Sequence, residues 1–283
     1  MITFGPGGNS LSFGKRRFPE DLPEYLANLG LNGYEIECGR GVRISDKTVE
    51  MLPKIAEENG IYLTLHAPYF ISLSGIVEET RLKSVDYILQ SARAAKSVGA
   101  RKIVVHSGSC LKITRAEALD LAKDTLKKAQ KALLDENLSE IIICPETMGK
   151  INQLGTLEEV LELCSVDERF LPTVDFGHLN ARTLGGIKTR EDYAKMLDLI
   201  EDKLGFDRAK NMHVHFSKIM YTSGGEKAHL TFEDDTYGPD YEPLLEEIHK
   251  RGLEPSIICE SDGTQAEDAA QMKKYFEKLT IEN

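Results

Sequence analysis

Short apolar runs alternate with longer segments of helical periodicity along nearly the whole chain. The apolar runs predict eight strands, at Ile2–Gly5, Tyr34–Cys38, Tyr62–His66, Lys102–His106, Ile141–Pro145, Pro172–Asp175, Met212–Phe216 and Ser256–Cys259. The segments between them predict eight helices, at Pro19–Leu29, Asp46–Asn59, Val77–Val98, Arg115–Glu136, Leu157–Leu163, Arg190–Lys203, Tyr241–Arg251 and Ala266–Leu279.

Eight strand and helix units in regular alternation favour a parallel sheet that closes into a (β/α)8 TIM barrel. The alternative is an open doubly wound sheet, but no Gly-x-Gly-x-x-Gly follows the first strand. No linker or repeat divides the 283 residues, so we expect one domain over 1–283. The longest irregular stretch, Ser217 to Pro239, is expected to cover the functional site, because long loops in compact domains are usually functional.

Nearly every later strand ends in a residue that can bind a metal or move a proton. These residues are His66, His106, Glu146, Asp175, His213 and His215, and Glu260. In a barrel the carboxyl ends of all strands open on one face, so a list along the sequence becomes a cluster in space. Many buried titratable groups in one place are costly unless paired, and metal ions are suitable partners.

The donors are imidazole nitrogens and carboxylate oxygens, which suit zinc, manganese or iron. Six of the seven histidines are expected at strand ends or in the following loops; only His249 falls on a predicted helix. Glu146 and Asp175 are in the middle of the set, and a carboxylate can bridge two cations of the kind that clamp a phosphoryl group. A single-metal isomerase or epimerase could use similar ligands.

Composition limits the cellular setting. No apolar run approaches the ~20 residues that span a bilayer, so we expect a cytoplasmic protein without membrane contact, acting as a monomer. Five cysteines form no obvious disulfide framework. A net charge of −11 argues against general attraction to nucleic acid, although a local basic face is compatible with it. Basic residues fall in the loops after the predicted strands, at Lys15, Arg16, Arg17, Arg40, Arg43, Lys112, Lys150, Arg182 and Lys218.

Seven short strings at the strand ends and in the loops resemble endonuclease IV, the metal-dependent apurinic/apyrimidinic endonucleases of the xylose-isomerase-like barrels. They are His66-Ala67-Pro68-Tyr69, His106-Ser107-Gly108-Ser109, Pro145-Glu146-Thr147, Asp175-Phe176-Gly177-His178, His215-Phe216-Ser217-Lys218, Ala228-His229 and Cys259-Glu260-Ser261. Each string alone is weak, but they follow the family's order and span the whole chain.

The resemblance implies two or three zinc-type ions. Glu146, the expected catalytic residue, would bridge one ion on His66 and His106 to a second on Asp175, His215 and Glu260. His178 and His229 would hold the third. The family also implies contacts to double-stranded DNA at an abasic site. Tyr69 and Phe70 occupy the places of the residues that enter the DNA, and Arg40 or Arg43 occupies the place of a DNA-binding arginine.

Two departures from the family pattern leave ligands open. Where the family has an Asp-x-His pair, this chain reads Lys227-Ala228-His229, and lysine cannot replace the aspartate, so either Glu226 moves in or the third site is altered. His213 and His215 alternate on one face of a strand, and the family spacing favours His215.

The sequence therefore leads to a metal-dependent endonuclease that cleaves DNA 5′ to abasic sites in base excision repair. The rivals are a single-metal sugar isomerase or epimerase on the same barrel, and a DNA-binding protein without cleavage activity.

Overall fold

The computed structural model of the chain describes residues 1–281. Its strands are β1 (Thr3–Pro6), β2 (Gly33–Glu37), β3 (Tyr62–His66), β4 (Lys102–Val105), β5 (Ile142–Pro145), β6 (Thr173–Asp175), β7 (His213–Phe216), β8 (Lys218–Thr222), β9 (Gly225–Leu230) and β10 (Ser256–Cys259). Its α-helices are α1 (Leu22–Asn28), α2 (Asp46–Asn59), α3 (Glu78–Val98), α4 (Arg115–Asp135), α5 (Leu157–Cys164), α6 (Phe176–Arg182), α7 (Arg190–Leu204), α8 (Phe206–Lys210), α9 (Glu242–Arg251) and α10 (Gln265–Ile281).

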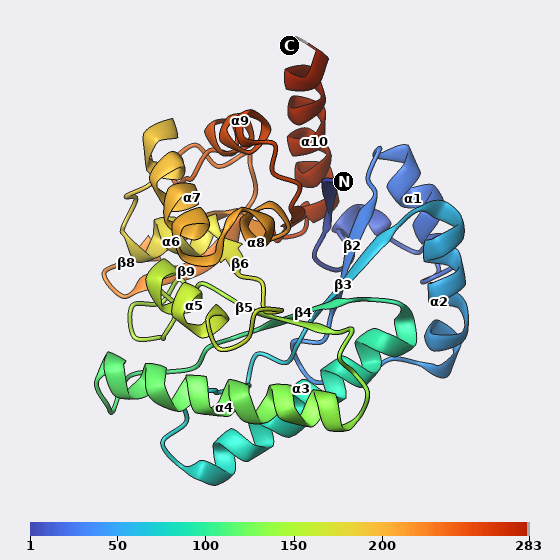
Figure 1. Cartoon of the computed structure of the whole chain (residues 1–283). Coiled ribbons are helices and arrows are strands. Elements are labelled where there is room, and N and C mark those ends of the chain that lie inside the picture. The colour runs from blue at the N-terminus through green and yellow to red at the C-terminus, as the bar shows by residue number, and fades with distance from the viewer. Residues whose placement is uncertain (282–283) are drawn as a thin grey trace.

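The parallel strands close into a barrel. Two four-stranded sheets, in the orders β1-β10-β7-β6 and β2-β3-β4-β5, meet at two seams. Parallel bridges join Gly7 to Glu35 at one seam and Glu146 to Thr173 at the other. Helices surround the strands on the outside (Figure 1). The predicted (β/α)8 barrel is thus confirmed, and the open sheet is excluded.

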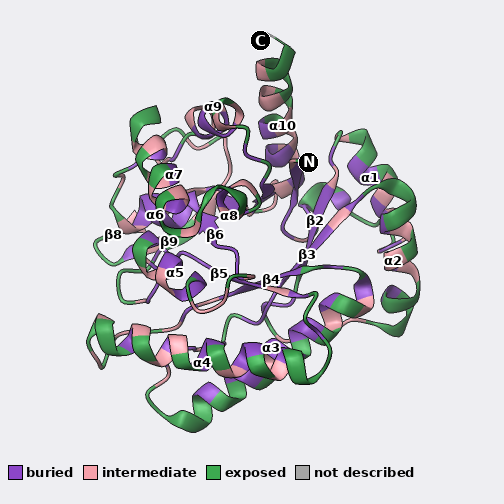
Figure 2. Ribbon diagram, in the orientation of Figure 1, coloured by how far each residue is buried: buried purple, intermediate pink, exposed green. Residues whose placement is uncertain are grey.

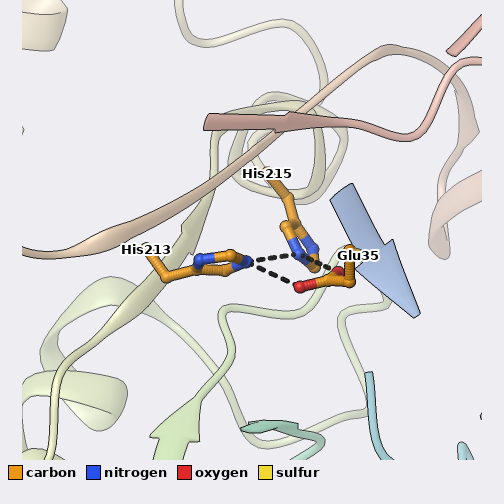
Figure 3. Close-up of side chains that lie close together, drawn as sticks. All are labelled: Glu35, His213 and His215. Carbon is orange, nitrogen blue, oxygen red and sulfur yellow. Dashed lines mark hydrogen bonds and ion pairs between the residues drawn. The ribbon is translucent and has the colours of Figure 1, made fainter. Parts of the chain in front are cut away.

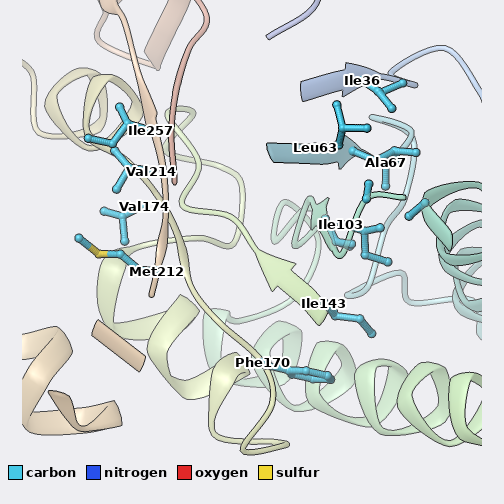
Figure 4. Close-up of a cluster of buried hydrophobic side chains, with 14 of the residues drawn as sticks. Ile36, Leu63, Ala67, Ile103, Ile143, Phe170, Val174, Met212, Val214 and Ile257 are labelled. Carbon is cyan, nitrogen blue, oxygen red and sulfur yellow. The ribbon is translucent and has the colours of Figure 1, made fainter. Parts of the chain in front are cut away.

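Alternation along the strands separates an apolar outer layer from a polar interior. Outward-facing residues such as Ile36, Leu63 and Val214 are buried beneath the helices (Figure 4), whose own outer faces are exposed (Figure 2). The alternate residues Glu35 and His213 are fully buried inside the barrel. Barrel interiors are usually filled by branched apolar side chains, so this polar filling must serve another purpose.

The expectation of an irregular Ser217–Pro239 segment was wrong in part. Strands β8 and β9 form an antiparallel hairpin within it, because Ser223-Gly224 makes a two-residue turn that lets Thr222 pair with Gly225. Helices α6 and α8 were also not predicted; both are short.

Other boundaries differ from the prediction by a few residues. Strand β1 begins one residue later than expected, at Thr3. Helix α1 is shorter than the predicted Pro19–Leu29, because the Asp21 carboxylate accepts a hydrogen bond from the backbone N–H of Arg17 at 2.8 Å and holds the preceding residues in a turn.

Two expectations from composition concern cysteines and membranes. All five cysteines are free thiols. Among the described residues, no helix combines the length and apolar character required to cross a membrane.

The seam between β1 and β2 depends on close backbone approach, which yields a stability prediction. A Cβ atom on Gly5 would lie 2.0 Å from the carbonyl oxygen of Gly33, a backbone atom that cannot swing away. We expect Gly5→Ala to lower the free energy of unfolding by at least about 1–3 kcal/mol, the usual cost of overpacking. Urea denaturation measures this change in the free energy of unfolding. Gly224→Ala is the control, because its Cβ would meet only Thr222 Oγ1 at 3.8 Å; equal midpoints for the two variants would refute the explanation.

Candidate metal centre

The strand-end residues predicted from the sequence meet at the carboxyl end of the barrel. His66 is the last residue of β3, Asp175 ends β6, and His215 lies within β7. His106, Glu146 and Glu260 directly follow β4, β5 and β10. The barrel therefore converts six separate strand ends into one cluster of nitrogen and oxygen donors.

Glu146 lies at the centre of this cluster and is fully buried. Its Oε2 is 3.1 Å from His106 Nε2 and 3.5 Å from His66 Nε2. Its Oε1 is 3.0 Å from Nδ1 of His215. The two carboxylate oxygens thus face different histidines, which is the arrangement of a bridging ligand.

A second donor group consists of Glu146, Asp175, His215 and Glu260, whose ligand atoms all lie within 4.8 Å of one another. Asp175 Oδ1 accepts the backbone N–H of His178 at 2.7 Å and so begins helix α6. Its Oδ2 is buried and accepts no hydrogen bond, although His178 Nδ1 lies 3.2 Å away. A buried carboxylate oxygen without a donor is costly, and a cation would satisfy it.

A third group brings together His178, Glu226 and His229. Glu226 Oε2 lies 3.5 Å from His178 Nε2. In the β8–β9 ladder Met220 pairs with Ala228 but Tyr221 pairs with Glu226, so Lys227 is an extra residue in a bulge. The bulge places Glu226 in the same donor group as His229 and leaves Lys227 exposed.

Hydrogen bonds orient three of the histidines. Nδ1 of His66 lies 2.7 Å from the Ala67 carbonyl oxygen, and Nδ1 of His178 lies 2.9 Å from that of Thr147. Because a carbonyl only accepts, each Nδ1 carries the proton and each Nε2 is left as a ligand. His229 Nδ1 contacts Ser217 Oγ at 2.9 Å. Such outer contacts are typical of metal-binding histidines.

The electrostatics keep most carboxylates ionised. Burial opposes ionisation of Glu146, but the histidines around it outweigh burial and hold its pKa well below the ordinary value. Burial likewise opposes ionisation of Glu260, yet His215 brings its pKa down to about 2. Burial raises the pKa of Asp175 to about 6. The donor set therefore fits a borderline divalent cation such as Zn²⁺, Mn²⁺ or Fe²⁺.

The structure separates the two histidines of β7. His215 faces Glu146 and Glu260, whereas His213 lies deeper, with its Nε2 2.9 Å from Glu35 Oε2 (Figure 3). Sequence reasoning missed Glu35. Its signal was present: Glu35 and Glu37 alternate within one buried strand, where carboxylates are rare unless paired.

Two hollows open next to the donors and share Tyr69, His229 and Glu260. One, of about 510 Å³, is also lined by Arg40 and Arg43; the other, of about 400 Å³, is also lined by Lys150. The predicted arginines thus lie at the mouth beside the donor cluster, and both are exposed.

The two aromatic residues after β3 are each about half exposed, Tyr69 at 52% and Phe70 at 50%. The Tyr69 ring stacks on His106 with centroids 5.3 Å apart, and its hydroxyl donates to Glu37 Oε2 at 3.1 Å. Phe70 packs edge-on against Tyr87, outside the donor cluster. Both therefore retain apolar surface that a ligand can contact.

Two basic residues expected around the mouth are occupied elsewhere. Arg182 donates to four carbonyl oxygens, those of Met148, Lys150, Ile151 and Gln153, at 2.8 to 3.2 Å. Lys218 donates to the Asp234 carbonyl. These cations hold loops together because the loops turn their carbonyls inward, so the basic face is smaller than the sequence suggested.

Comparison with known proteins agrees with this architecture. The family model described as xylose isomerase-like TIM barrel matches residues 23–279. An uncharacterized protein of Methanocaldococcus jannaschii is 30% identical over 277 residues, 98% of each chain. A probable endonuclease 4 of Enterococcus faecalis is 25% identical over 258 residues, 87% of this chain and 83% of that protein.

Solved structures share the fold. Endonuclease IV from Thermus thermophilus has a TM-score of 0.67 at 19% identity, covering 99% of this chain and 100% of the other. A D-tagatose 3-epimerase-like protein has a TM-score of 0.75 at 21% identity, covering 99% of both. The resemblance to endonuclease IV seen in the sequence is thus confirmed, and the chain belongs to the xylose isomerase-like TIM barrel family.

Proposed function

We propose that the protein is a metal-dependent phosphodiester hydrolase that cleaves DNA 5′ to abasic sites. The observation that carries the proposal is the position of Glu146, whose two oxygens face separate sets of nitrogen donors. A carboxylate that bridges two cations fits phosphoryl transfer, in which attacking and leaving oxygens both need stabilisation. The similarity to probable endonuclease 4 proteins supports the same activity.

The proposed ions and the protein's own residues would have different roles. His66 and His106 would hold one ion, Asp175, His215 and Glu260 a second, and His178, Glu226 and His229 a third. When bound, the ions would supply a Lewis acid and an activated water. The chain's own residues fix the donors in place, through the hydrogen bonds of His66, His178 and His229 to neighbouring oxygens.

The mouth offers groups suited to a gapped duplex. Arg40 and Arg43 can bind phosphate, and binding by such contacts weakens as salt rises. Tyr69 beside the donor cluster and Phe70 outside it are each about half exposed, and both can fill the space of a missing base. These contacts would overcome the net charge of −11 locally.

Two other functions predict different results. A sugar epimerase on this barrel would work with a single ion and leave abasic DNA intact. A DNA-binding protein would show salt-sensitive affinity for abasic duplex without cutting it.

Incubation with a duplex that contains one abasic site tests the activity. We expect cleavage that a chelator stops and added zinc restores. Glu146→Gln keeps the side-chain shape but removes the bridging charge, so the rate should fall by at least ~10²-fold. Circular dichroism checks that the variant is folded. A folded variant within a few-fold of the unaltered protein would remove Glu146 from the mechanism.

The second prediction concerns the aromatic pair. Replacing Tyr69 and Phe70 together by alanine should weaken binding to abasic duplex by about 1–3 kcal/mol per stacking ring, with less effect on intact duplex. Fluorescence anisotropy on both duplexes measures the difference. Phe206→Ala is the control, because Phe206 is 47% exposed on α8, which precedes β7 and so lies at the amino ends of the strands, opposite the mouth. Equal weakening on both duplexes would indicate a packing role instead.

The third prediction concerns the bulge in β9. Glu226→Ala should remove one ion per chain, because Glu226 lies among the third group of donors. Lys227→Ala should leave the ion count unchanged, because Lys227 is exposed. Elemental analysis of both variants decides it. An unchanged count in Glu226→Ala would mean that the third group holds no ion.

A further inference from the structure

A column of buried polar side chains runs through the barrel beneath the metal centre. Its members are Lys102, 5% exposed, Ser256, 4% exposed, and the fully buried His213 and Glu35. None belongs to the three donor groups described above, although Glu35 also lies close to Glu37 and Glu260. Burying such groups is costly unless each hydrogen bond is made. The order of donors and acceptors along the column therefore indicates which atom of each side chain carries a proton.

At the amino end of the strands, Lys102 determines which atoms donate and which accept in the first hydrogen bonds of the column. Its Nζ donates to the carbonyl oxygens of Asn211 at 2.8 Å and Met212 at 3.4 Å, and to Ser256 Oγ at 2.9 Å. An ammonium group has three hydrogens and cannot accept. Ser256 Oγ therefore accepts from Lys102, and its own hydrogen is free for another partner.

That partner is His213, whose Nδ1 lies 2.8 Å from Ser256 Oγ. Because Nδ1 accepts, the proton of a neutral His213 is on Nε2. This nitrogen lies 2.9 Å from Glu35 Oε2, which also accepts from the Thr64 hydroxyl at 2.7 Å. The order of donors and acceptors that begins with Lys102 therefore ends at the Glu35 carboxylate, which only accepts.

Glu35 also faces His215 (Figure 3). Its Oε1 lies 2.8 Å from His215 Nε2 and has no other hydrogen-bond partner, so it is free to accept from that nitrogen. The two Nε2 atoms also form a hydrogen bond of 3.1 Å, in which one donates and the other accepts. When Nδ1 of His215 binds an ion, the proton of its neutral ring must be on Nε2, and Glu35 Oε1 is then the acceptor within reach.

The consequence appears at the other ring nitrogen. His215 Nδ1 lies 3.0 Å from Glu146 Oε1 and 3.4 Å from Glu260 Oε2. Without an ion Nδ1 donates its proton to Glu146, because a carboxylate only accepts. A cation bound between the ring and the two carboxylates would take the place of that proton. We infer that Lys102, Ser256, His213 and Glu35 form a positioning relay that fixes Nδ1 of His215 as the nitrogen that binds the second metal. The inference rests on the metal centre of the proposed function, not on its substrate.

A different reading is that Glu35, His213 and His215 hold an ion of their own, since their ligand atoms also converge. The hydrogen bonds of Lys102 and Ser256 argue against an ion bound by these three residues. An ion there would need a lone pair on His213 Nε2, whereas Lys102 and Ser256 direct the proton to that atom. The ammonium group of Lys102 would also repel the ion.

Zinc binding to metal-free protein tests the relay. Zinc is titrated against a chromophoric chelator for Glu35→Gln and, as a smaller change, Ser256→Ala. We expect affinity at one site to fall by about 10- to 100-fold, as for other outer contacts of metal ligands. The control is Glu247→Gln, which alters a carboxylate that is 2% exposed and paired with Arg190 and Arg251 on the outer helices. It should leave zinc affinity unchanged.

Two further measurements separate the relay from an additional ion. Nitrogen NMR of the zinc-loaded protein should show protonated Nε2 on both His213 and His215. Combining Glu35→Gln with Glu260→Ala should lose no more zinc than Glu260→Ala alone, because both changes affect the same ion.

Three results would overturn the inference: zinc affinity within twofold of the unaltered protein in both relay variants, a proton on Nδ1 of His215 in the loaded protein, or a further ion lost in the double variant. Failure of the proposed function looks different. Absence of abasic cleavage with weakened zinc binding in Glu35→Gln would remove the nuclease and leave the relay standing.

Discussion

The structure depends on a negative charge buried where water cannot reach it. Glu146 is fully enclosed at the carboxyl end of the barrel, and Asp175 and Glu260 are close by. Carboxylates in such a place either take up protons or are neutralised by cations. Histidines approach Glu146 from three other strands, and each of these strands places its ligand by the same geometry, at the end where parallel strands open.

This geometry explains why so much of the fold and the candidate site could be predicted from the sequence. Parallel strands end together, so His66 and Glu260 could be expected in one cluster although they lie far apart along the chain. The bulge at Lys227 was harder to predict from the sequence. Glu226 was already a candidate to replace the missing carboxylate at position 227, but only the register of β8 with β9 shows that one extra residue brings Glu226 among the donors.

The interior of the barrel was not predictable in the same way. Lys102 and Ser256 stand at the first positions of their strands, where a polar residue usually indicates a solvent-exposed end. Only closure of the barrel brings these strand starts together across the axis, and only then does Ser256 come within reach of both Lys102 and His213. Glu35 was missed because the argument followed strand ends, whereas Glu35 lies in the middle of β2.

The two sides of the barrel mouth differ, because Arg182 holds four backbone carbonyls on one side only. On one side, residues 148–153 are tied to α6, and the β8–β9 hairpin is attached to them through the bridge between Lys150 and Gly225. On the other side, Arg40, Arg43 and Tyr69 line an open hollow. A stiff molecule entering this mouth would meet one wall built from loops that Arg182 holds together and one wall that presents two exposed cations. Its shape would be matched by the first wall and its charge by the second.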